Sequence, residues 1–509
     1  MRNILNISID KYAQSYCLKD ADNKIFLSFS KFNELTVKVA TYIKNIYKIK
    51  KGQRIAIIYD SSMEFAIIFH ALLKIKAIPL PLSDELTIAE YKKYISFIKP
   101  DWIWPKSIEL YRIFYAKCFK VLHPINYTFI TQIKEYSEEF YYYPDYSDDE
   151  IGVIVLTSGT NSNPKGVMLK FNGLLEALEK CVDKFQIYNT TTIFQIMPFY
   201  HAEGCFSTLL IPWLSGASVL FIGKLNIQKI VNYWKYVYDY GINYLIVLPT
   251  LLQTLIDTYN KKNEKYYIAE YAKCGSSFLL EKTREDFENK FHIKIIDVYG
   301  STESNAISVG DLTSARSNGS VGRLTHISEV KVTEENELMV KNARWFAGYL
   351  NDARLTAKVF DGIWYKTGDL GVIKNEEVIL LGRKDDIINR NGYKISPKEI
   401  DEVVMKDTAV FEVFTIGEKD SSMNDLIIVF VVLNDLEKEN MITKHRNLYN
   451  ICRNNLAVYK MPDRILFVDH ILLNSIGKPS KKLMSNFFKN SIAYSDANII
   501  YLNNSLEDN

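Results

Sequence analysis

Short β-branched runs alternate with helix-like segments along most of this chain, and this alternation constrains the fold more than any other feature. Arg54–Asp60 has the pattern of a strand, and residues 61–76 have the apolar period of a helix with Ser61 or Ser62 at its N-cap. The run AIPLPL that follows has the pattern of the next strand. After a tyrosine-rich stretch around residues 120–146, the runs IGVIVL, TIFQIM, ASVLFI, YLIVL and IKIIDV continue the pattern. Strands that alternate with helices predict mostly parallel sheets covered on both faces.

The pattern changes beyond about Thr325, which indicates a second domain in a chain of 509 residues. The runs ELMV, WYKTGDLGVI and EEVILLGR resemble short antiparallel strands. A smaller α+β stretch follows them, with a helix-like KEIDEVVMK and a pair of strands around FEVFTIGE and LIIVFVVL. We place the boundary at Gly382–Asp386, where a strand ends in consecutive charges. The predicted fold is α/β. It has a large N-terminal body (1–384) of mostly parallel sheets layered with helices plus a β-subdomain, and a small C-terminal α+β domain (385–509).

Charge and hydropathy exclude several classes of protein. The 62 basic and 60 acidic residues give a net charge of +2, which does not indicate binding to nucleic acid or an anionic membrane. Apolar runs such as Leu426–Leu433 are much shorter than the roughly 18 residues typical of a membrane span. The six cysteines have no metal-ligand spacing, and the N-terminus has no signal-peptide pattern. We therefore expect a cytoplasmic protein without a membrane span.

The segment VIVLTSGTNSNPKGVML (Val153–Leu169) places a polar loop between two apolar runs. The small residues around Gly159 would let backbone N–H groups approach a phosphate, and Lys165 could neutralise its charge. The segment does not match the P-loop pattern GxxxxGK[ST], because Pro164 stands in place of the second glycine. Considered alone, a polar loop between a strand and a helix is more often a simple connection.

Other motifs follow in a fixed order. DVYGSTES (Asp297–Ser304) comes after a strand, where open α/β sheets bind ligands, and WYKTGDLG (Trp364–Gly371) comes later. LGRKDDIINRNGYKISPKEID and a lysine-rich C-terminal segment containing IGKPSKK complete the series. Each carboxylate, tyrosine or lysine in these motifs would, singly, more often be a surface or core residue.

Together and in this order, the motifs resemble the adenylate-forming superfamily of acyl- and aryl-CoA synthetases, peptide-synthetase adenylation domains and beetle luciferases. The similarity extends over about residues 26–482. It implies an ATP-dependent acid–thiol ligase that forms an acyl-AMP, releases pyrophosphate and transfers the acyl group to a thiol. The nucleotide-binding residues that the resemblance implies are Thr157, Ser158, Gly159, Thr160, Lys165, Gly275, Asp297, Tyr299, Gly300, Asp369 and Arg383.

The resemblance assigns roles to several of these residues. The polar loop with Lys165 would cover the β- and γ-phosphates of ATP, although Asn161-Ser162 replaces the usual Thr-Gly. Tyr299 would stack on adenine, and Asp297 would accept a hydrogen bond from the adenine amino group. Asp369 would accept hydrogen bonds from both ribose hydroxyls, with Arg383 beside it.

The remaining roles concern the reaction. Thr302 would donate to the α-phosphate, and Glu303 would hold Mg²⁺, a cation that prefers oxygen ligands. Lys478 corresponds to the catalytic lysine of the small domain, which bridges the acid carboxylate and the α-phosphate. The sequence around it departs from the family pattern, with Leu472-Leu473-Asn474 for Pro-Arg-Thr and Pro479 after the lysine.

The resemblance also implies a mobile small domain. Asp385 corresponds to a hinge about which this domain rotates between the adenylating and thioester-forming states. In the second state, the loop with Gly392 would replace Lys478 at the active site. A simple interdomain turn is the alternative.

The acid pocket is expected in residues 195–221 and near two later segments. His201 corresponds to the histidine that gates the carboxylate, and Ser276 and Ser301 are candidate wall residues. Glu203 is unusual, because a carboxylate facing such a pocket costs free energy unless it is paired or hydrated. It either faces away or reads an amine or another donor on the substrate, a small carboxylic acid.

Three further alternatives stay open. The thiol is expected to be coenzyme A, with the phosphopantetheine arm of a separate carrier protein as the alternative. A catalytically idle nucleotide-binding protein would explain the departures in the phosphate loop and around Lys478. The presence of Lys478, Glu303, Asp369 and Arg383 argues against it. Light emission would need an oxygen-handling pocket, for which the sequence gives no sign.

Overall fold

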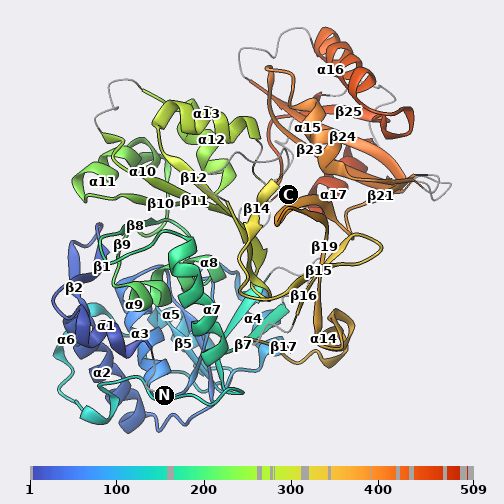
Figure 1. Cartoon of the computed structure of the whole chain (residues 1–509). Helices are drawn as coiled ribbons and strands as arrows, with labels where there is room; N and C mark the ends of the chain where they lie inside the picture. Colours follow the sequence, from blue (N-terminus) through green and yellow to red (C-terminus); the bar gives the residue numbers. More distant parts are fainter. Residues whose placement is uncertain are drawn as a thin grey trace. The chain divides into compact units, whose positions relative to one another are not determined.

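The computed structural model describes residues 4–157, 165–260, 266–275, 279, 281–310, 320–341, 345–390, 393–419, 425–434, 441–473, 479–492 and 501–502 (Figure 1). The chain divides into two compact units, which differ from the two predicted domains in three short segments. The predicted boundary at residue 385 stays a prediction. The first unit comprises Met1–Lys331, Met339–Thr367 and Asn375–Val378, and the second comprises Val332–Leu338, Gly368–Lys374 and Ile379–Asn509.

The largest sheet of the first unit has parallel strands at its centre and antiparallel pairs at both ends. Its order is β2-β1-β9-β8-β10-β11-β12-β13-β14. Neighbours from β1 to β12 run parallel, so the prediction of mostly parallel strands is confirmed there. The strands are β1 (Tyr16–Asp20), β2 (Ile25–Ser28), β8 (Thr192–Gln195), β9 (Ser218–Phe221), β10 (Tyr244–Val247), β11 (Tyr271–Gly275), β12 (Lys294–Ser301), β13 (Asn305–Val309) and β14 (Ser320–Leu324).

Helices cover both faces of the centre of this sheet (Figure 1). On one face, α12 (Pro249–Asp257) and α13 (Glu281–Phe291) share a core with Ala272 and Cys274 of β11. On the other face, α7 (Phe171–Lys184) packs on alternate residues of the strands. The further helices of this unit are α1 (Asn6–Lys11), α2 (Phe29–Ile46), α6 (Tyr127–Gln132), α8 (Ala202–Cys205), α9 (Ile211–Ser215), α10 (Ile227–Val231), α11 (Tyr233–Asp239) and α14 (Ala353–Val359).

A smaller parallel sheet has the order β4-β3-β5. The Ser62 hydroxyl accepts a hydrogen bond from the backbone N–H of Phe65 and so caps the helix α3 that follows β3. The predicted strand, capped helix and strand are therefore confirmed. The elements are β3 (Arg54–Ile58), α3 (Met63–Lys74), β4 (Ile78–Leu82), α4 (Ile88–Ile98), β5 (Trp102–Pro105) and α5 (Ile108–Tyr115).

The two apolar runs that flank the predicted phosphate loop form a pair of antiparallel strands and not a strand and a helix. β6 (Ile151–Thr157) pairs antiparallel with β7 (Lys165–Lys170), and β7 pairs with β17 (Phe346–Tyr349). The expectation of a helix after the loop is wrong, because the second apolar run forms β7 and the helix α7 starts only at Phe171. Buried side chains on both strands favour this pairing.

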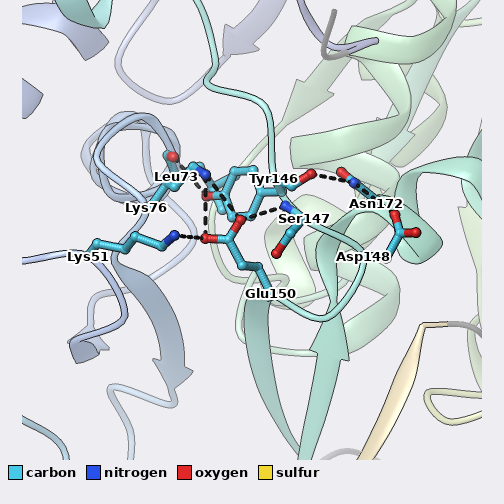
Figure 2. A network of polar contacts seen from close by, with 8 residues as sticks. All are labelled: Lys51, Leu73, Lys76, Tyr146, Ser147, Asp148, Glu150 and Asn172. Carbon is cyan, nitrogen blue, oxygen red and sulfur yellow. Dashed lines mark hydrogen bonds and ion pairs between the residues drawn. The ribbon is translucent and has the colours of Figure 1, made fainter. Parts of the chain in front are cut away.

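The base of the hairpin is held by a polar network (Figure 2). The Glu150 carboxylate accepts hydrogen bonds from Lys51, from Lys76 at 3.0 Å and from the backbone N–H of Ser147 at 2.6 Å. The side-chain amide of Asn172 donates to the Tyr146 carbonyl at 2.6 Å. The network therefore joins the segment before β6 to the segment after β7 and to the end of α3.

Residues 330–383, which are divided between the two units, contribute five further strands. Residues 332–338, 368–374 and 379–383 carry parts of three neighbouring strands, β16, β19 and β20, within the second unit. These match the predicted runs ELMV, WYKTGDLGVI and EEVILLGR. The strands are β15 (Val330–Val332), β16 (Glu337–Lys341), β18 (Phe360–Asp361), β19 (Trp364–Lys374) and β20 (Glu377–Arg383).

The second unit is built on a sheet of order β23-β24-β25-β26 with a separate hairpin, β21-β22. The strand pair predicted around FEVFTIGE and LIIVFVVL is antiparallel, and the predicted helix KEIDEVVMK is present. The elements are β21 (Ile388–Arg390), β22 (Tyr393–Ile395), α15 (Pro397–Val404), β23 (Val410–Lys419), β24 (Asp425–Leu433), α16 (Met441–Asn455), β25 (Arg464–Val468), α17 (Lys481–Ile492) and β26 (Tyr501–Leu502).

The structure also shows the length of the apolar helices and the state of the cysteines. Among the described residues, no helix has both the length and the apolarity that crossing a bilayer demands. The six cysteines are free thiols, and all except Cys118 are buried.

We predict that Glu150→Gln lowers the free energy of unfolding by about 1 kcal/mol at pH 7, since the ion pairs contact solvent and are screened. Desolvation alone would raise the pKa of Glu150. Hydrogen bonds from Lys51, the Ser147 backbone and Lys76, together with the charge of Lys76, outweigh it and lower the pKa to about 2. The stabilisation is therefore complete above the ordinary carboxylate pKa and disappears as the pH falls towards 2.

Urea unfolding of both proteins between pH 7 and pH 3 measures this effect. The difference between wild type and variant should shrink as the pH falls. Asp148→Asn is the matched control, because this carboxylate makes only a 3.5 Å contact with Asn172 in the same network. A difference that stays constant over this range would contradict the assignment.

Candidate functional site

The β12–β13 hairpin carries the predicted adenine- and phosphate-binding residues Asp297, Tyr299, Thr302 and Glu303. The register of the two strands shifts between Tyr299 and Gly300, where a bulge bends β12. A Cβ atom at Gly300 would lie 1.8 Å from the carbonyl oxygen of Asn305, so no other residue fits this position without backbone movement. The glycine of the motif is thus required by the turn itself.

Serine side chains hold the turn in shape. The backbone N–H of Ser301 donates to Ser304 Oγ at 2.8 Å, and the backbone N–H of Ser304 donates to Ser301 Oγ at 3.1 Å. These reciprocal bonds fix the two residues between them, Thr302 and Glu303. Ser301, predicted as a wall of the acid pocket, therefore also has a structural role.

Glu303 is buried, and two residues hold it: Tyr349 of β17, and Trp345, which directly precedes β17. The Tyr349 hydroxyl donates to Glu303 Oε1 at 2.8 Å, and the Trp345 indole N–H donates to the Glu303 carbonyl at 2.9 Å. Burial, together with the Glu303 carboxylate, raises the pKa of Tyr349 far above its ordinary value. The hydroxyl therefore keeps its proton and acts as a permanent donor to Glu303.

Lys165 reaches the same tyrosine from the hairpin. Lys165 pairs with Thr157 as the last residue pair of β6 and β7, and its Nζ lies 5.6 Å from the centroid of the Tyr349 ring. This distance is typical of a cation–π contact. The predicted phosphate lysine and the predicted magnesium carboxylate thus meet on opposite parts of one tyrosine.

The oxygen donors at this place fit a magnesium ion that is carried by phosphates. Among the residues that the structure describes, no group of three or more His, Cys, Asp or Glu side chains could hold a metal alone. Mg²⁺ commonly uses one or two protein carboxylates and completes its shell with water and substrate phosphates. Glu303, fixed by Tyr349, is suited to be that single carboxylate.

Asp297 and Gly275 lie on neighbouring strands. Gly275 pairs with Val298, and Asp297 pairs with Cys274. The Asp297 carboxylate forms an ion pair with Arg284 of α13 and is almost fully buried. Its predicted bond to adenine would therefore use a carboxylate whose orientation is already fixed by an arginine.

The predicted ribose-binding pair lies together in the second unit. Arg383 Nε lies 3.3 Å from Asp369 Oδ1, and the backbone N–H of Lys384 donates to the Gly368 carbonyl at 2.8 Å. Lys384 also binds Glu337 at 2.9 Å. The predicted hinge residue, Asp385, follows directly in a turn, so the ion pairs of this region fix the chain just before it.

The predicted gating histidine caps a short helix. His201 Nδ1 accepts a hydrogen bond from the backbone N–H of Glu203 at the start of α8. Glu203 Oε1 in turn accepts hydrogen bonds from Ser207 and from Lys273 Nζ, the latter at 2.9 Å. The cost that the sequence analysis expected for the Glu203 carboxylate is therefore offset by an ion pair with Lys273.

Six predicted residues lie outside the described residues, so their roles stay predictions: Ser158, Gly159, Thr160, Ser276, Gly392 and Lys478.

Four residues that hold predicted site residues in place were not predicted from the sequence: Tyr349, Trp345, Arg284 and Lys273. Lys273 had a visible signal, because it is a charged residue in the middle of the apolar run of β11. Tyr349 had none, since it is one of 34 tyrosines and contacts Glu303 across 46 positions of sequence.

Comparisons with known proteins identify the family of this chain. The model of a family described as AMP-binding enzyme matches residues 7–350, and that of the AMP-binding enzyme C-terminal domain matches residues 399–478. The acyl-CoA synthetase ALT10 of Alternaria alternata is 24% identical, over 86% of this chain and 89% of that protein. The 2-succinylbenzoate–CoA ligase of Listeria innocua is 26% identical, over 84% of this chain and 88% of that protein.

Among solved structures, ATP-bound MatB from Rhodopseudomonas palustris superimposes with a TM-score of 0.86 at 22% identity, over 96% of this chain and 100% of that one. This likeness supports the fold. The family match and the CoA-ligase relatives show that the chain is an ATP-dependent acid–thiol ligase. The chain belongs to the AMP-binding enzyme family of the adenylate-forming superfamily, which confirms the resemblance seen in the sequence.

We predict that Tyr349→Phe lowers kcat/KM for ATP about tenfold and raises the Mg²⁺ concentration needed for half-maximal activity. The variant keeps the ring near Lys165 but removes the hydroxyl that fixes Glu303 Oε1. Steady-state pyrophosphate release at several Mg²⁺ concentrations measures both effects.

Tyr146→Phe is the matched control, because it also removes one tyrosine hydroxyl. This hydroxyl donates to the Leu73 carbonyl at 2.8 Å and not to Glu303. It should lower stability by about 1 kcal/mol and leave the Mg²⁺ requirement unchanged. Equal Mg²⁺ requirements of wild type and Tyr349→Phe would contradict a positioning role for Tyr349.

Proposed function

We propose that this chain is an acid–CoA ligase that activates a small carboxylic acid with ATP and Mg²⁺. The observation that carries the proposal is the cluster of Lys165, Tyr349 and Glu303, which places one cation and one fixed carboxylate together. A triphosphate needs positive charge along its oxygens, and its metal needs an oxygen ligand. The cluster supplies both from segments that are distant in sequence.

The chemistry follows the class of enzyme. A carboxylate oxygen of the acid attacks the α-phosphorus of ATP, the bond to the bridging oxygen breaks, and pyrophosphate leaves. Thr302 would donate a hydrogen bond to the α-phosphate from the turn that Ser301 and Ser304 hold. Lys478 would bring its charge to the same phosphate, where negative charge builds up in the transition state. Bound Mg²⁺ would neutralise the leaving pyrophosphate, with Glu303 as its protein ligand.

The second step transfers the acyl group to a thiol. The thiol sulfur attacks the acyl carbon, the bond from that carbon to the AMP oxygen breaks, and AMP leaves. We assign coenzyme A as the thiol, because the relatives are named acyl-CoA synthetase and CoA ligase. The acyl-carrier alternative has no support from these names.

Two parts of the proposal concern the small domain. Asp385 would be the hinge, and the loop with Gly392, which joins β21 to β22, would approach the pantetheine arm in the thioester-forming state. The nearby ion pairs of Lys384 with Glu335 and Glu337 support this, because they anchor the chain on one side of the turn at Asp385.

A pyrophosphate-release screen over fatty, aryl and hydroxy acids, with hydroxylamine to trap the acyl-AMP, tests the function. Adding CoA or a phosphopantetheinylated carrier protein then identifies the acceptor. We expect a hydroxamate with at least one acid and an acyl-CoA product. No hydroxamate from any acid would favour the idle nucleotide-binding alternative, and loading of the carrier without acyl-CoA would overturn CoA as the thiol.

We predict that Lys478→Ala lowers the rate of hydroxamate formation about 100-fold or more, because the charge at the α-phosphate is lost in the transition state. Lys482→Ala is the matched control in the same lysine-rich segment and should change this rate less than about threefold. Single-turnover trapping with the best acid measures both variants, and equal losses would show that Lys478 has no special role.

A further inference from the structure

The partly buried ion pair between Glu203 and Lys273 is not explained by the binding of ATP. Lys273 lies in β11 opposite Ile246 of β10, on the sheet face that α7 covers. Glu203 and Ser207 lie four residues apart on consecutive helical turns and meet Lys273 there, at 2.9 Å and 3.4 Å from its Nζ. The Lys273 ammonium also lies 4.1 Å from the centroid of the Phe185 ring. The lysine is therefore satisfied on several sides within the protein.

The two members of the pair differ in accessibility. The Lys273 side chain is 5% exposed, whereas the Glu203 side chain is 26% exposed. Lys273 and Ser207 both contact Oε1 of Glu203, and no described residue forms a hydrogen bond with Oε2. The part of the pair that a small molecule can reach is thus a carboxylate oxygen and not the ammonium group.

The carboxylate is charged and partly shielded from water. Desolvation is the largest influence on the Glu203 pKa and would raise it, but the charge and hydrogen bonds of Lys273, with Ser207 and His201, lower the pKa below its ordinary value. The Glu203 carboxylate is therefore strongly desolvated, although its side chain is still 26% exposed. Glu203 therefore offers an ionised acceptor in a poorly hydrated place.

This place adjoins the hairpin of the candidate site. Cys181 of α7 lies 3.8 Å from Oδ1 of Asn305, the first residue of β13 after the Thr302–Glu303 turn. Burial raises the pKa of the Cys181 thiol. The charge of Lys273 opposes this rise and the charge of Glu203 adds to it, so both charged groups lie near the cysteine. The backbone N–H of Glu203 binds His201, the predicted gate of the acid. The ion pair is thus connected to both the nucleotide turn and the acid gate.

We propose that Glu203 determines substrate specificity by accepting a hydrogen bond, through Oε2, from a hydroxyl, amide or amine group on the acid. This inference rests on the proposed function and names the class of its substrate. Lys273 balances the charge of Glu203, so the substrate needs a hydrogen-bond donor and not a full positive charge. A second carboxylate on the acid would meet Oε2 and be repelled. The chain therefore selects donor-bearing monocarboxylic acids and rejects dicarboxylic ones.

The test compares acids that share a shape. We would measure kcat/KM by pyrophosphate release for two series: hydroxybutyrate, butyrate and succinate, and para-hydroxybenzoate, para-toluate and terephthalate. In the series whose acids wild type activates, kcat/KM for the hydroxy acid should exceed that for the apolar acid and that for the dicarboxylic acid by about tenfold or more. The apolar acid leaves Oε2 of Glu203 without a hydrogen bond, and the dicarboxylic acid is repelled by it. Preference for the apolar or dicarboxylic acid in that series would overturn the proposal.

Two variants locate the effect at Glu203. Glu203→Gln leaves the Lys273 charge unbalanced, so the dicarboxylate-to-hydroxy-acid ratio of kcat/KM should rise about tenfold or more. Ser207→Ala is the matched control, because it keeps both charges, and should change this ratio less than about threefold. If Glu203→Gln folds poorly, Glu203→Gln with Lys273→Gln removes both charges, and its ratio should also rise.

The outcomes separate the two proposals. Wild type that activates no acid in the broad hydroxamate screen contradicts the proposed function. Wild type that activates acids while the Glu203 variants keep its preferences contradicts only the role of Glu203.

Discussion

The hydrogen bond from Tyr349 to Glu303 is the interaction on which the organisation of the first unit's site depends. A carboxylate as buried as Glu303 is costly unless a donor satisfies it. Tyr349 supplies this donor from β17, which pairs with β7, and β7 begins at Lys165. One bond therefore sets the β12–β13 turn relative to the end of the phosphate-loop hairpin.

The same hairpin is constrained at its other end. At the base, the charges around Glu150 and the amide of Asn172 fix where β6 begins and β7 ends (Figure 2). At the open end, Thr157 and Lys165 are the last paired residues. Since the register of a hairpin shifts every side chain to the other face when it slips by one residue, fixing the base also fixes which way Lys165 points.

Local patterns predicted those parts of this structure that depend on near neighbours. The strand, Ser62-capped helix and strand around α3 follow from periodicity and capping. The helix expected after the phosphate loop was wrong, because the second apolar run pairs with β6 and also with β17, which is distant in sequence. Tyr349 and Glu203–Lys273 were missed for the same reason, since tertiary pairing is not visible in a local window.

The Glu203–Lys273 pair shows how a cost in the core can serve recognition. Two buried charges gain little stability over apolar side chains of the same size, so stability alone does not explain their presence. Lys273 holds Glu203 ionised and oriented through one oxygen, and the second oxygen stays accessible. A lone carboxylate there would either take up a proton or require a cation. Paired with Lys273, the Glu203 carboxylate stays charged and needs only a hydrogen-bond donor from the substrate. The balance between the charges of Glu203 and Lys273 is therefore the basis on which the pocket discriminates between acids.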